Sequence, residues 1–264
     1  MKTIDQSIVK WFSKFNGTIT AFSGGIDSTL VLYLSHAVLG EKAVGCISIS
    51  PSLKRKDYAF AIDFCRRYQI KLEVIETKEL EDKDYFLNPV NRCYICKSHL
   101  YKSLNVVRNQ YPNYAILNGI NVDDLGDYRP GIKAAQELNI KSPLEELGFD
   151  KKKIREIAHS LGLPNWDKPA SPCLSSRIPY GDRIDLNKLI QIEKAENVLN
   201  EYGFTNVRVR HYESYASIEV PVDEIDKLQE YNDLINEKLR MIGFDEVKID
   251  REGFKSGKLN QKIA

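Results

Sequence analysis

A glycine turn that could hold a phosphate group lies near the start of the chain, at Ser23-Gly-Gly-Ile-Asp-Ser28. An apolar, β-branched run precedes it at 18–22, and a helix-like run follows at 29–39. A strand, a glycine turn and a helix together present backbone N–H groups to an anion. The two glycines permit a sharp turn and a close approach to the ligand, and the serines add hydroxyl donors. Asp27 stands where it can cap the helix or contact a magnesium ion.

The motif is not a Walker A loop, which requires G-x-x-x-x-G-K-[ST]. It resembles the pyrophosphatase loop (PP-loop), S-G-G-x-D-S, of the ATP-pyrophosphatase superfamily, and it matches every fixed position. Members of that superfamily split ATP between the α- and β-phosphates, adenylate a substrate and release pyrophosphate. A glycine turn in an ordinary α/β domain is the alternative. The resemblance implies that ATP and Mg²⁺ are bound by Ser23, Gly24, Gly25, Asp27, Ser28, Ser50 and Gly119.

A second group that could do chemistry is the C-x-x-C pair Cys93 and Cys96. The pair lies in the first turn of a helical pattern that continues to about residue 108, so both sulfurs share one face of that helix. A helix N-terminus and the neighbouring Arg92 and Lys97 favour the thiolate form. Lys97 could also neutralise the charge of pyrophosphate or of a metal cluster.

The other three cysteines differ in their surroundings. Cys46 lies within a predicted strand and Cys65 within an amphipathic helix, so both are expected to be small buried hydrophobic residues. Cys173 stands alone and, with the C-x-x-C pair, would hold a 4Fe–4S cluster in which one iron lacks a protein ligand. Three other interpretations stay open: reduced structural thiols, a persulfide on Cys173 that the pair resolves, and zinc with a fourth, non-cysteine ligand.

The elements that position these residues alternate along the first part of the chain. Predicted strands occupy 18–22, 43–49, 71–75 and 114–117. Predicted helices occupy 5–15, 29–39, 53–68, 93–108 and 151–161. This alternation predicts an α/β fold, a doubly wound parallel sheet that binds its ligand at the carboxyl ends of the strands.

The pattern changes after a segment rich in proline, serine and charged residues at 164–184. We therefore predict a PP-loop domain at 1–168, a linker that carries site residues at 169–184 and a small α+β domain at 185–264. In the last domain, the expected order is a helix, two strands, a helix and a strand, at 186–202, 207–211, 217–220, 222–242 and 246–249. An antiparallel sheet is expected there.

Composition limits the functional class. The chain has 264 residues, of which 42% are hydrophobic and 28% charged, as in ordinary globular proteins. A net charge of +1 provides no general basic field, so nucleic acid is not expected as a partner. No apolar run is long enough to cross a membrane, and residues 1–10 lack the apolar core of a signal peptide. A cytoplasmic enzyme is expected.

Several motifs together resemble the LarE family of ATP-dependent sulfur transferases, which build the nickel-pincer nucleotide cofactor of lactate racemase. Besides the PP-loop and the C-x-x-C pair, the likeness includes Asp127-Tyr-Arg-Pro-Gly131, Ser175-Ser-Arg-Ile-Pro-Tyr-Gly181 and Val207-Arg-Val-Arg210. It extends from about residue 19 to residue 260. The PP-loop alone is specific only to the superfamily, whereas the last two segments are more specific to the family.

The resemblance implies a two-step reaction on a small-molecule nucleotide. A carboxylate of pyridinium-3,5-biscarboxylic acid mononucleotide would attack the α-phosphate of ATP, and sulfur would then displace AMP to give a thiocarboxylate. Some members surrender the sulfur of a lone cysteine and lack the C-x-x-C pair; here that position is Pro172, next to Cys173. The chain therefore resembles the three-cysteine branch, with Cys93, Cys96 and Cys173 as cluster ligands and Cys173, Asp27 and Lys97 as catalytic residues.

The same resemblance implies a substrate-binding set: Ser176, Arg177, Glu196, Arg208, Arg210 and Lys255. Arg208 and Arg210 alternate in a strand, so both guanidinium groups lie on one face, where they suit a nucleotide phosphate. A solvated strand face is the alternative for the arginines, and an exposed helix charge is the alternative for Glu196. A homo-oligomer is expected, with the small C-terminal domain as the candidate for assembly.

Three other functions remain as alternatives. A PP-loop tRNA thiolase can also use three cysteines, but it should carry a basic surface and an RNA-binding appendage. An amide-forming member, such as an NAD synthetase or argininosuccinate synthetase, has no use for three thiols. A nucleotide- or metal-binding module without catalysis would not release pyrophosphate from ATP.

Overall fold

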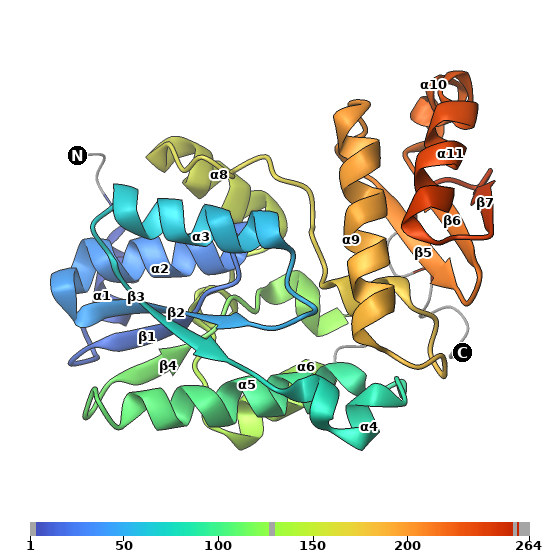
Figure 1. Ribbon diagram of the computed structural model, residues 1–264. Coiled ribbons are helices and arrows are strands. Elements are labelled where there is room, and N and C mark those ends of the chain that lie inside the picture. The colour runs from blue at the N-terminus through green and yellow to red at the C-terminus, as the bar shows by residue number, and fades with distance from the viewer. Residues whose placement is uncertain (1–3, 127–129, 256–257, 259–264) are drawn as a thin grey trace. The chain divides into compact units, whose positions relative to one another are not determined.

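The computed structural model describes residues 4–126, 130–255 and 258 (Figure 1). It divides into two compact units, 1–79 with 91–171 and 80–90 with 172–264. The first three residues of the predicted motif 127–131 lie outside the described residues. Among the helices that the structure describes, none has the length and apolar character needed to cross a membrane.

The first unit contains a four-stranded sheet in which every pairing is parallel. Its strands are β1 (Thr18–Ala21), β2 (Ala43–Ile49), β3 (Lys71–Glu76) and β4 (Ala115–Leu117), in the order β3-β2-β1-β4. Thr18 pairs with Ala43 on one side and with Ala115 on the other, so the carboxyl ends of the two central strands and β4 meet at one edge. The predicted parallel sheet is confirmed.

Helices cover both faces of this sheet, as a doubly wound fold requires (Figure 1). One face packs against α1 (Gln6–Phe12), α2 (Ile26–Leu39), α3 (Arg55–Arg67) and α8 (Lys151–Leu161). The other packs against α5 (Arg92–Arg108) and α6 (Pro130–Glu137). Shorter elements are η1 (Gly40–Lys42), η2 (Glu79–Glu81), η3 (Val122–Gly126) and α7 (Pro143–Glu146).

The sequence explains why α8 begins and ends where it does. The carboxylate of Asp150 accepts a hydrogen bond from the backbone N–H of Lys153 at 2.7 Å and so caps the first turn. Gly162 ends the helix with a φ of 73°, the left-handed conformation that glycine adopts without steric cost. The observed bounds equal the predicted ones. By contrast, α1 is shorter than the predicted 5–15 because the chain turns at Ser13.

The second unit has its own core and a three-stranded sheet of β5 (Arg208–Tyr212), β6 (Tyr215–Glu219) and β7 (Glu246–Ile249). Strands β5 and β6 form the predicted antiparallel hairpin. The prediction of a wholly antiparallel sheet is wrong, because β7 pairs with β6 in parallel. The connection through α10 (Ile225–Glu230) and α11 (Asn232–Ile242) returns the chain to run in the direction of β6.

Two further features of the second unit differ from the predicted pattern. The expected helix 222–242 is divided into η5 (Val222–Glu224), α10 and α11, with Tyr231 between the last two. The segment 80–90, which contains α4 (Lys83–Phe86), belongs to this unit, with α9 (Leu186–Glu201) and η4 (Leu174–Arg177). The Asn88 amide holds it there by donating to the carbonyls of Pro179 at 2.6 Å and Asp182 at 2.9 Å.

Candidate functional site

The PP-loop joins the carboxyl end of β1 to α2 and leaves its backbone amides at the helix N-terminus. Gly24 has a φ of 72°, and Gly25 is the N-cap residue, with no side-chain cap of the helix. The Ser28 hydroxyl lies 3.1 Å from the Ser23 hydroxyl and donates to the Gly25 carbonyl at 3.1 Å. The loop is therefore held by its own serines, and its geometry suits an anion.

Asp27 lies in the first turn of α2 and does not cap that helix. Its Oδ2 forms an ion pair with the Lys151 ammonium group at the start of α8. Its Oδ1 is buried and has no hydrogen-bond partner among the residues that the structure describes. The Lys151 backbone N–H in turn donates to Asp123 Oδ2 at 2.8 Å, which joins α8 to the segment after β4. A buried carboxylate oxygen without a partner is the kind of group that a hard cation such as Mg²⁺ would satisfy.

A segment after α8 holds the main chain of the PP-loop. The Asn165 amide donates to the Gly24 carbonyl at 3.3 Å and to the Thr29 hydroxyl at 2.9 Å. The Lys168 ammonium group donates to the same carbonyl at 3.1 Å and to Asp57 Oδ1 at 2.7 Å. The Gly24 carbonyl of the predicted phosphate site thus has two partners that lie far away in the sequence.

The two remaining residues of the predicted ATP-binding set follow strands of the same sheet at their carboxyl ends. Gly119 follows β4, and a Cβ atom built there would come within 2.9 Å of the Ser28 backbone nitrogen. The end of β4 therefore packs directly on the start of α2. Ser50 follows β2, and its hydroxyl accepts from the backbone N–H of Ser52 at 3.2 Å. Both positions lie at the strands' carboxyl ends, where a doubly wound sheet binds ligands.

The five cysteines fall into two classes. Cys46 and Cys65 are buried, as predicted, and burial raises the pKa of each thiol to about 12. Cys93 and Cys173 are exposed, and Cys96 is half-buried. Only the second class has the accessibility that a metal ligand or a nucleophile needs.

The structure places the predicted cluster cysteines in different units. Cys93 and Cys96 lie in the first turn of α5 in the first unit, whereas Cys173 is the N-cap residue of η4 in the second. Among the described residues, no group of three or more His, Cys, Asp or Glu side chains could hold a metal ion. Lys97 follows the pair on α5, where its stem packs against Gly131 of α6. The roles assigned to these residues stay predictions.

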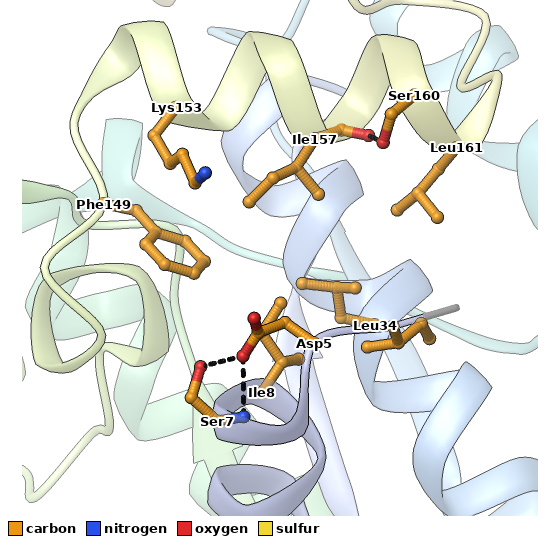
Figure 2. A pocket seen from close by; sticks show the side chains of 10 residues that line it. Asp5, Ser7, Ile8, Leu34, Phe149, Lys153, Ile157, Ser160 and Leu161 are labelled. Atoms are coloured by element: carbon orange, nitrogen blue, oxygen red, sulfur yellow. Dashed lines mark hydrogen bonds between the residues drawn. The ribbon is translucent and has the colours of Figure 1, made fainter. Parts of the chain in front are cut away.

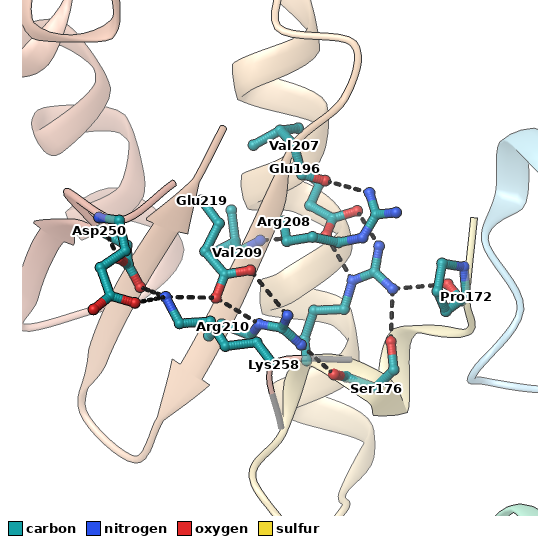
Figure 3. A network of polar contacts seen from close by, with 12 residues as sticks. Pro172, Ser176, Glu196, Val207, Arg208, Val209, Arg210, Glu219, Asp250 and Lys258 are labelled. Atoms are coloured by element: carbon teal, nitrogen blue, oxygen red, sulfur yellow. Dashed lines mark hydrogen bonds and ion pairs between the residues drawn. The ribbon is translucent and has the colours of Figure 1, made fainter. Parts of the chain in front are cut away.

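Four of the predicted substrate residues are buried charged residues of one network in the second unit (Figure 3): Arg177, Glu196, Arg208 and Arg210. Arg177 is fully buried and pairs with both oxygens of Glu196, at 2.7 and 3.2 Å. Arg210 pairs in the same way with Glu219, at 3.1 and 2.9 Å, and donates to the Ser176 carbonyl at 2.7 Å. The alternative of a solvated strand face for Arg208 and Arg210 is therefore excluded, because these two side chains are only 5% and 6% exposed.

Arg208 and Glu196 are charged residues in a buried environment, unlike an ion pair on the protein surface. Burial, and after it repulsion from Arg177, lowers the pKa of Arg208 to about 10. Glu196 is only 3% exposed and also accepts from the Val209 backbone N–H at 3.3 Å, so it is not an exposed helix charge. The network thus holds three guanidinium groups against two carboxylates.

The C-terminal segment contributes a residue that the sequence pattern did not single out. Lys255, the predicted basic group, is exposed and pairs with Glu252 at 3.2 Å. Lys258 instead reaches the network (Figure 3): it pairs with Asp250 and lies 3.9 Å from Glu219.

A separate pocket of about 210 Å³ lies between α1, α2 and α8 (Figure 2). Leu34, Phe149 and Ile157 give it an apolar wall, and Asp5 and Lys153 lie at its rim. Of the described residues that line it, none belongs to the PP-loop and none is a cysteine. We therefore place the candidate site at the PP-loop and not in this pocket.

Sequence reasoning missed four residues that contact the PP-loop: Asp57, Lys151, Asn165 and Lys168. A weak signal existed for Lys151, because it begins the helix that follows the aspartate-rich loop after β4. No local pattern distinguishes Asn165 or Lys168, which lie more than 130 residues from the loop that they contact.

Comparison with known proteins agrees with this geometry. The NAD synthase family model matches residues 2–85, which contain the PP-loop. A pyridinium-3,5-bisthiocarboxylic acid mononucleotide synthase from Lactiplantibacillus plantarum is 36% identical over 264 residues, covering 100% of this chain and 96% of its own length.

Two uncharacterized proteins are also similar. One from Synechocystis sp. is 40% identical over 260 residues, 98% of this chain and 97% of its own. One from Methanocaldococcus jannaschii is 32% identical over 239 residues, 90% of each chain. With a parallel sheet, a PP-loop at its carboxyl edge and full-length similarity to the L. plantarum synthase, the chain belongs to the LarE family of ATP-dependent sulfurtransferases within the PP-loop superfamily.

Proposed function

We propose that this enzyme adenylates a carboxylate of pyridinium-3,5-biscarboxylic acid mononucleotide and converts it to a thiocarboxylate in nickel-pincer cofactor biosynthesis. The observation that carries the proposal is the similarity over the full chain to a synthase named for the bisthiocarboxylic acid product. The PP-loop, with backbone amides at a helix N-terminus and Asp27 beside them, supplies the ATP-activating half of that reaction.

In the first step, a carboxylate oxygen attacks the α-phosphorus of ATP, the bond to the bridging oxygen breaks, and pyrophosphate leaves. Such a transfer needs in-line positioning and charge neutralisation more than a strong base. The PP-loop amides and hydroxyls would hold the leaving pyrophosphate. Mg²⁺ fits beside Asp27, because Oδ1 of that carboxylate is buried and lacks a partner among the described residues.

In the second step, a sulfur nucleophile attacks the carbonyl carbon of the acyl-adenylate and AMP leaves. Cys93, Cys96 and Cys173 would be the ligands of a 4Fe–4S cluster, because the other two cysteines are buried with a pKa of about 12. When bound, the cluster would supply a sulfide for the transfer. Lys97, next to Cys96, would offset the negative charge of the thiolates.

The arginine network of the second unit would recognise the nucleotide phosphate of the substrate. Arg177 and Arg210 are already oriented by carboxylates, with planar donor groups that match phosphate oxygens. An anion near Arg208 would offset the burial and the repulsion from Arg177 that lower the pKa of its guanidinium group. Ser176 would add a hydroxyl, and Lys255 would be a peripheral cation.

The proposal is tested by anaerobic purification, iron and sulfide analysis, and sulfur transfer from a donor in excess. About four irons per chain are expected in the wild type. Cys93→Ala, Cys96→Ala and Cys173→Ala should each lose iron and multiple turnover, whereas the matched control Cys65→Ala should keep both. An iron-free protein that still transfers sulfur many times would remove the cluster and favour a persulfide. A wild type that forms no AMP in the presence of the substrate would contradict the proposed function itself.

A further inference from the structure

The carbonyl groups of the two PP-loop glycines, Gly24 and Gly25, both accept hydrogen bonds. The Gly24 carbonyl accepts hydrogen bonds from Asn165 Nδ2 and Lys168 Nζ. The Gly25 carbonyl accepts from the hydroxyl and the backbone N–H of Thr29, at 2.8 and 2.9 Å. Asn165 also donates to that hydroxyl, so one buried amide supports both peptides.

Because a peptide group is planar, the direction of its C=O bond also fixes the direction of its N–H bond. In a trans peptide the C=O and N–H bonds point to opposite sides. Fixing the Gly24 carbonyl toward Asn165 and Lys168 therefore directs the Gly25 N–H away from them. Within the described part of the chain, that N–H has only a long contact, 3.4 Å, to the Ser23 hydroxyl, which leaves it available to a phosphate oxygen.

The Lys168 ammonium group also contacts the first residues of α3. Its ammonium group lies 2.7 Å from Asp57 Oδ1 and over the Phe60 ring at 5.1 Å. The Ser171 hydroxyl donates to the other Asp57 oxygen at 3.2 Å. Gly24 also fits tightly against this element, since a Cβ atom at Gly24 would lie 2.7 Å from the Asp57 carbonyl oxygen. These contacts hold the ammonium group at the Gly24 carbonyl.

From these contacts we infer that Asn165 and Lys168 are positioning residues that aim the Gly25 N–H at the triphosphate of ATP. The inference rests on the proposed function, since it assumes that the loop binds ATP. Asn165 is 3% exposed, so it acts through the main chain and not by touching the nucleotide. The two side chains form a clamp on the loop from the segment that follows α8.

The clamp acts on the phosphates that the loop holds and not on the adenosine. Loss of either donor should therefore weaken a triphosphate much more than a monophosphate. Because one hydrogen bond to a charged group is at stake, at least about a tenfold loss is expected. A general loss of structure would weaken both nucleotides equally.

The test is calorimetric titration of Asn165→Leu and Lys168→Met with α,β-methylene-ATP and Mg²⁺, and separately with AMP. Both variants should bind the analogue at least about tenfold more weakly, with AMP affinity within about twofold of the wild type. Lys168→Arg, which keeps a donor, should recover most of the loss. Lys152→Met, an exposed lysine of α8, is the matched control and should bind like the wild type.

Equal losses for AMP and the analogue, or no loss in Lys168→Met, would overturn the clamp. If Asn165→Leu does not fold, Lys168→Met and Lys168→Arg still decide the question. Failure of the proposed function would look different: the wild type would bind the analogue normally but form no AMP from ATP and the substrate.

Discussion

The ion pair between Lys151 and Asp27 is the contact at which a single side chain most directly affects the proposed chemistry. Lys151 neutralises one oxygen of a carboxylate whose other oxygen is buried and has no partner among the described residues. A Mg²⁺ ion on that free oxygen would lie close to the ammonium group, and the two cations would repel each other. Lys151 therefore opposes binding of the proposed metal ion.

Removing this ammonium group should strengthen metal binding. The pair is partly exposed, with side chains 37% and 23% accessible, so it contributes about 1 kcal/mol or less. Lys151→Met should therefore lower the Mg²⁺ concentration needed for half-maximal binding of α,β-methylene-ATP by up to about fivefold. The measurement is a Mg²⁺ titration at fixed analogue, with Lys152→Met as control. A higher Mg²⁺ requirement in Lys151→Met would contradict this role.

His211 in β5 provides a residue-scale prediction about stability. Burial, and after it Lys188, lowers the pKa of its imidazole from 6.5 to about 4. Between these pH values only the unfolded chain binds the proton, so the free energy of unfolding falls as the pH falls. The loss between pH 7.5 and pH 5 should be about 2 kcal/mol.

Urea unfolding of wild type and His211→Gln at both pH values measures this loss. The glutamine variant should lose about 2 kcal/mol less on acidification than the wild type does. His159→Gln replaces an exposed histidine and serves as the control. The same pH dependence in His211→Gln and in the wild type would show that another group titrates.

At the scale of elements, the end of β4 and the start of α2 must approach each other closely. A side chain at Gly119 would meet the backbone nitrogen of Ser28 at 2.9 Å and the Asp27 Cβ at 3.0 Å. Real Cβ atoms rarely come so close, and backbone atoms of a buried helix start cannot move aside at little cost. The ATP-binding edge of the sheet therefore depends on the absence of a side chain at this position.

Gly119→Ala should displace β4 from α2 and destabilise the fold by about 1–3 kcal/mol. Binding of α,β-methylene-ATP should weaken more than overall stability alone explains, because the displaced atoms border the PP-loop. Gly126→Ala is the matched control, since its Cβ would meet no atom of the described residues within 4 Å. Thermal unfolding and analogue titration of the two variants make the comparison; equal behaviour would contradict the close approach.

Elements with a strong local signal were predictable from sequence. Strand β2 and helix α8 have the predicted bounds, because an apolar run and a capped helix contain their own end signals. The parallel pairing of β7 with β6 was not predictable from sequence, since the direction of a strand depends on the path of the preceding helices. The divided helix at Tyr231 reflects packing of the second core, which no period of the sequence encodes.

The site was predictable in part for the same reason. A glycine turn between a strand and a helix is local, so the PP-loop could be found directly. The distant partners of the Gly24 carbonyl could not be found in this way, because only tertiary folding brings Asn165 and Lys168 to that carbonyl. The arginines could be identified as candidates, but their burial depends on Glu196 and Glu219, which come from other elements.

At the scale of the whole molecule, the charge balance favours a small-molecule substrate over an RNA. The chain has 38 basic and 37 acidic residues, so it has no overall positive field. Nucleic-acid binding that depends on counterion release needs several phosphate contacts from clustered cations. The arginines of the second unit are buried, so they do not form an exposed surface that could contact several phosphates of an RNA.

We therefore expect tRNA affinity no better than non-specific binding, with a Kd weaker than about 10⁻⁶ M at physiological salt. Filter binding at several salt concentrations measures it, with an unrelated RNA of equal length as control. Tight binding of tRNA that falls steeply as salt rises would support the tRNA thiolase alternative.

The central claim is that ATP is split at the PP-loop, beside Asp27, to activate a carboxylate. Its most direct test follows α-labelled ATP and pyrophosphate release with pyridinium-3,5-biscarboxylic acid mononucleotide present, in wild type, Asp27→Asn and Asp63→Asn. Asp63 is an exposed aspartate of α3 that pairs with Arg66, so it controls for the loss of one carboxylate. Wild type and Asp63→Asn should form AMP and pyrophosphate in equal amounts, and Asp27→Asn should lose at least about a hundredfold in rate. AMP formation by Asp27→Asn at the wild-type rate would contradict the claim.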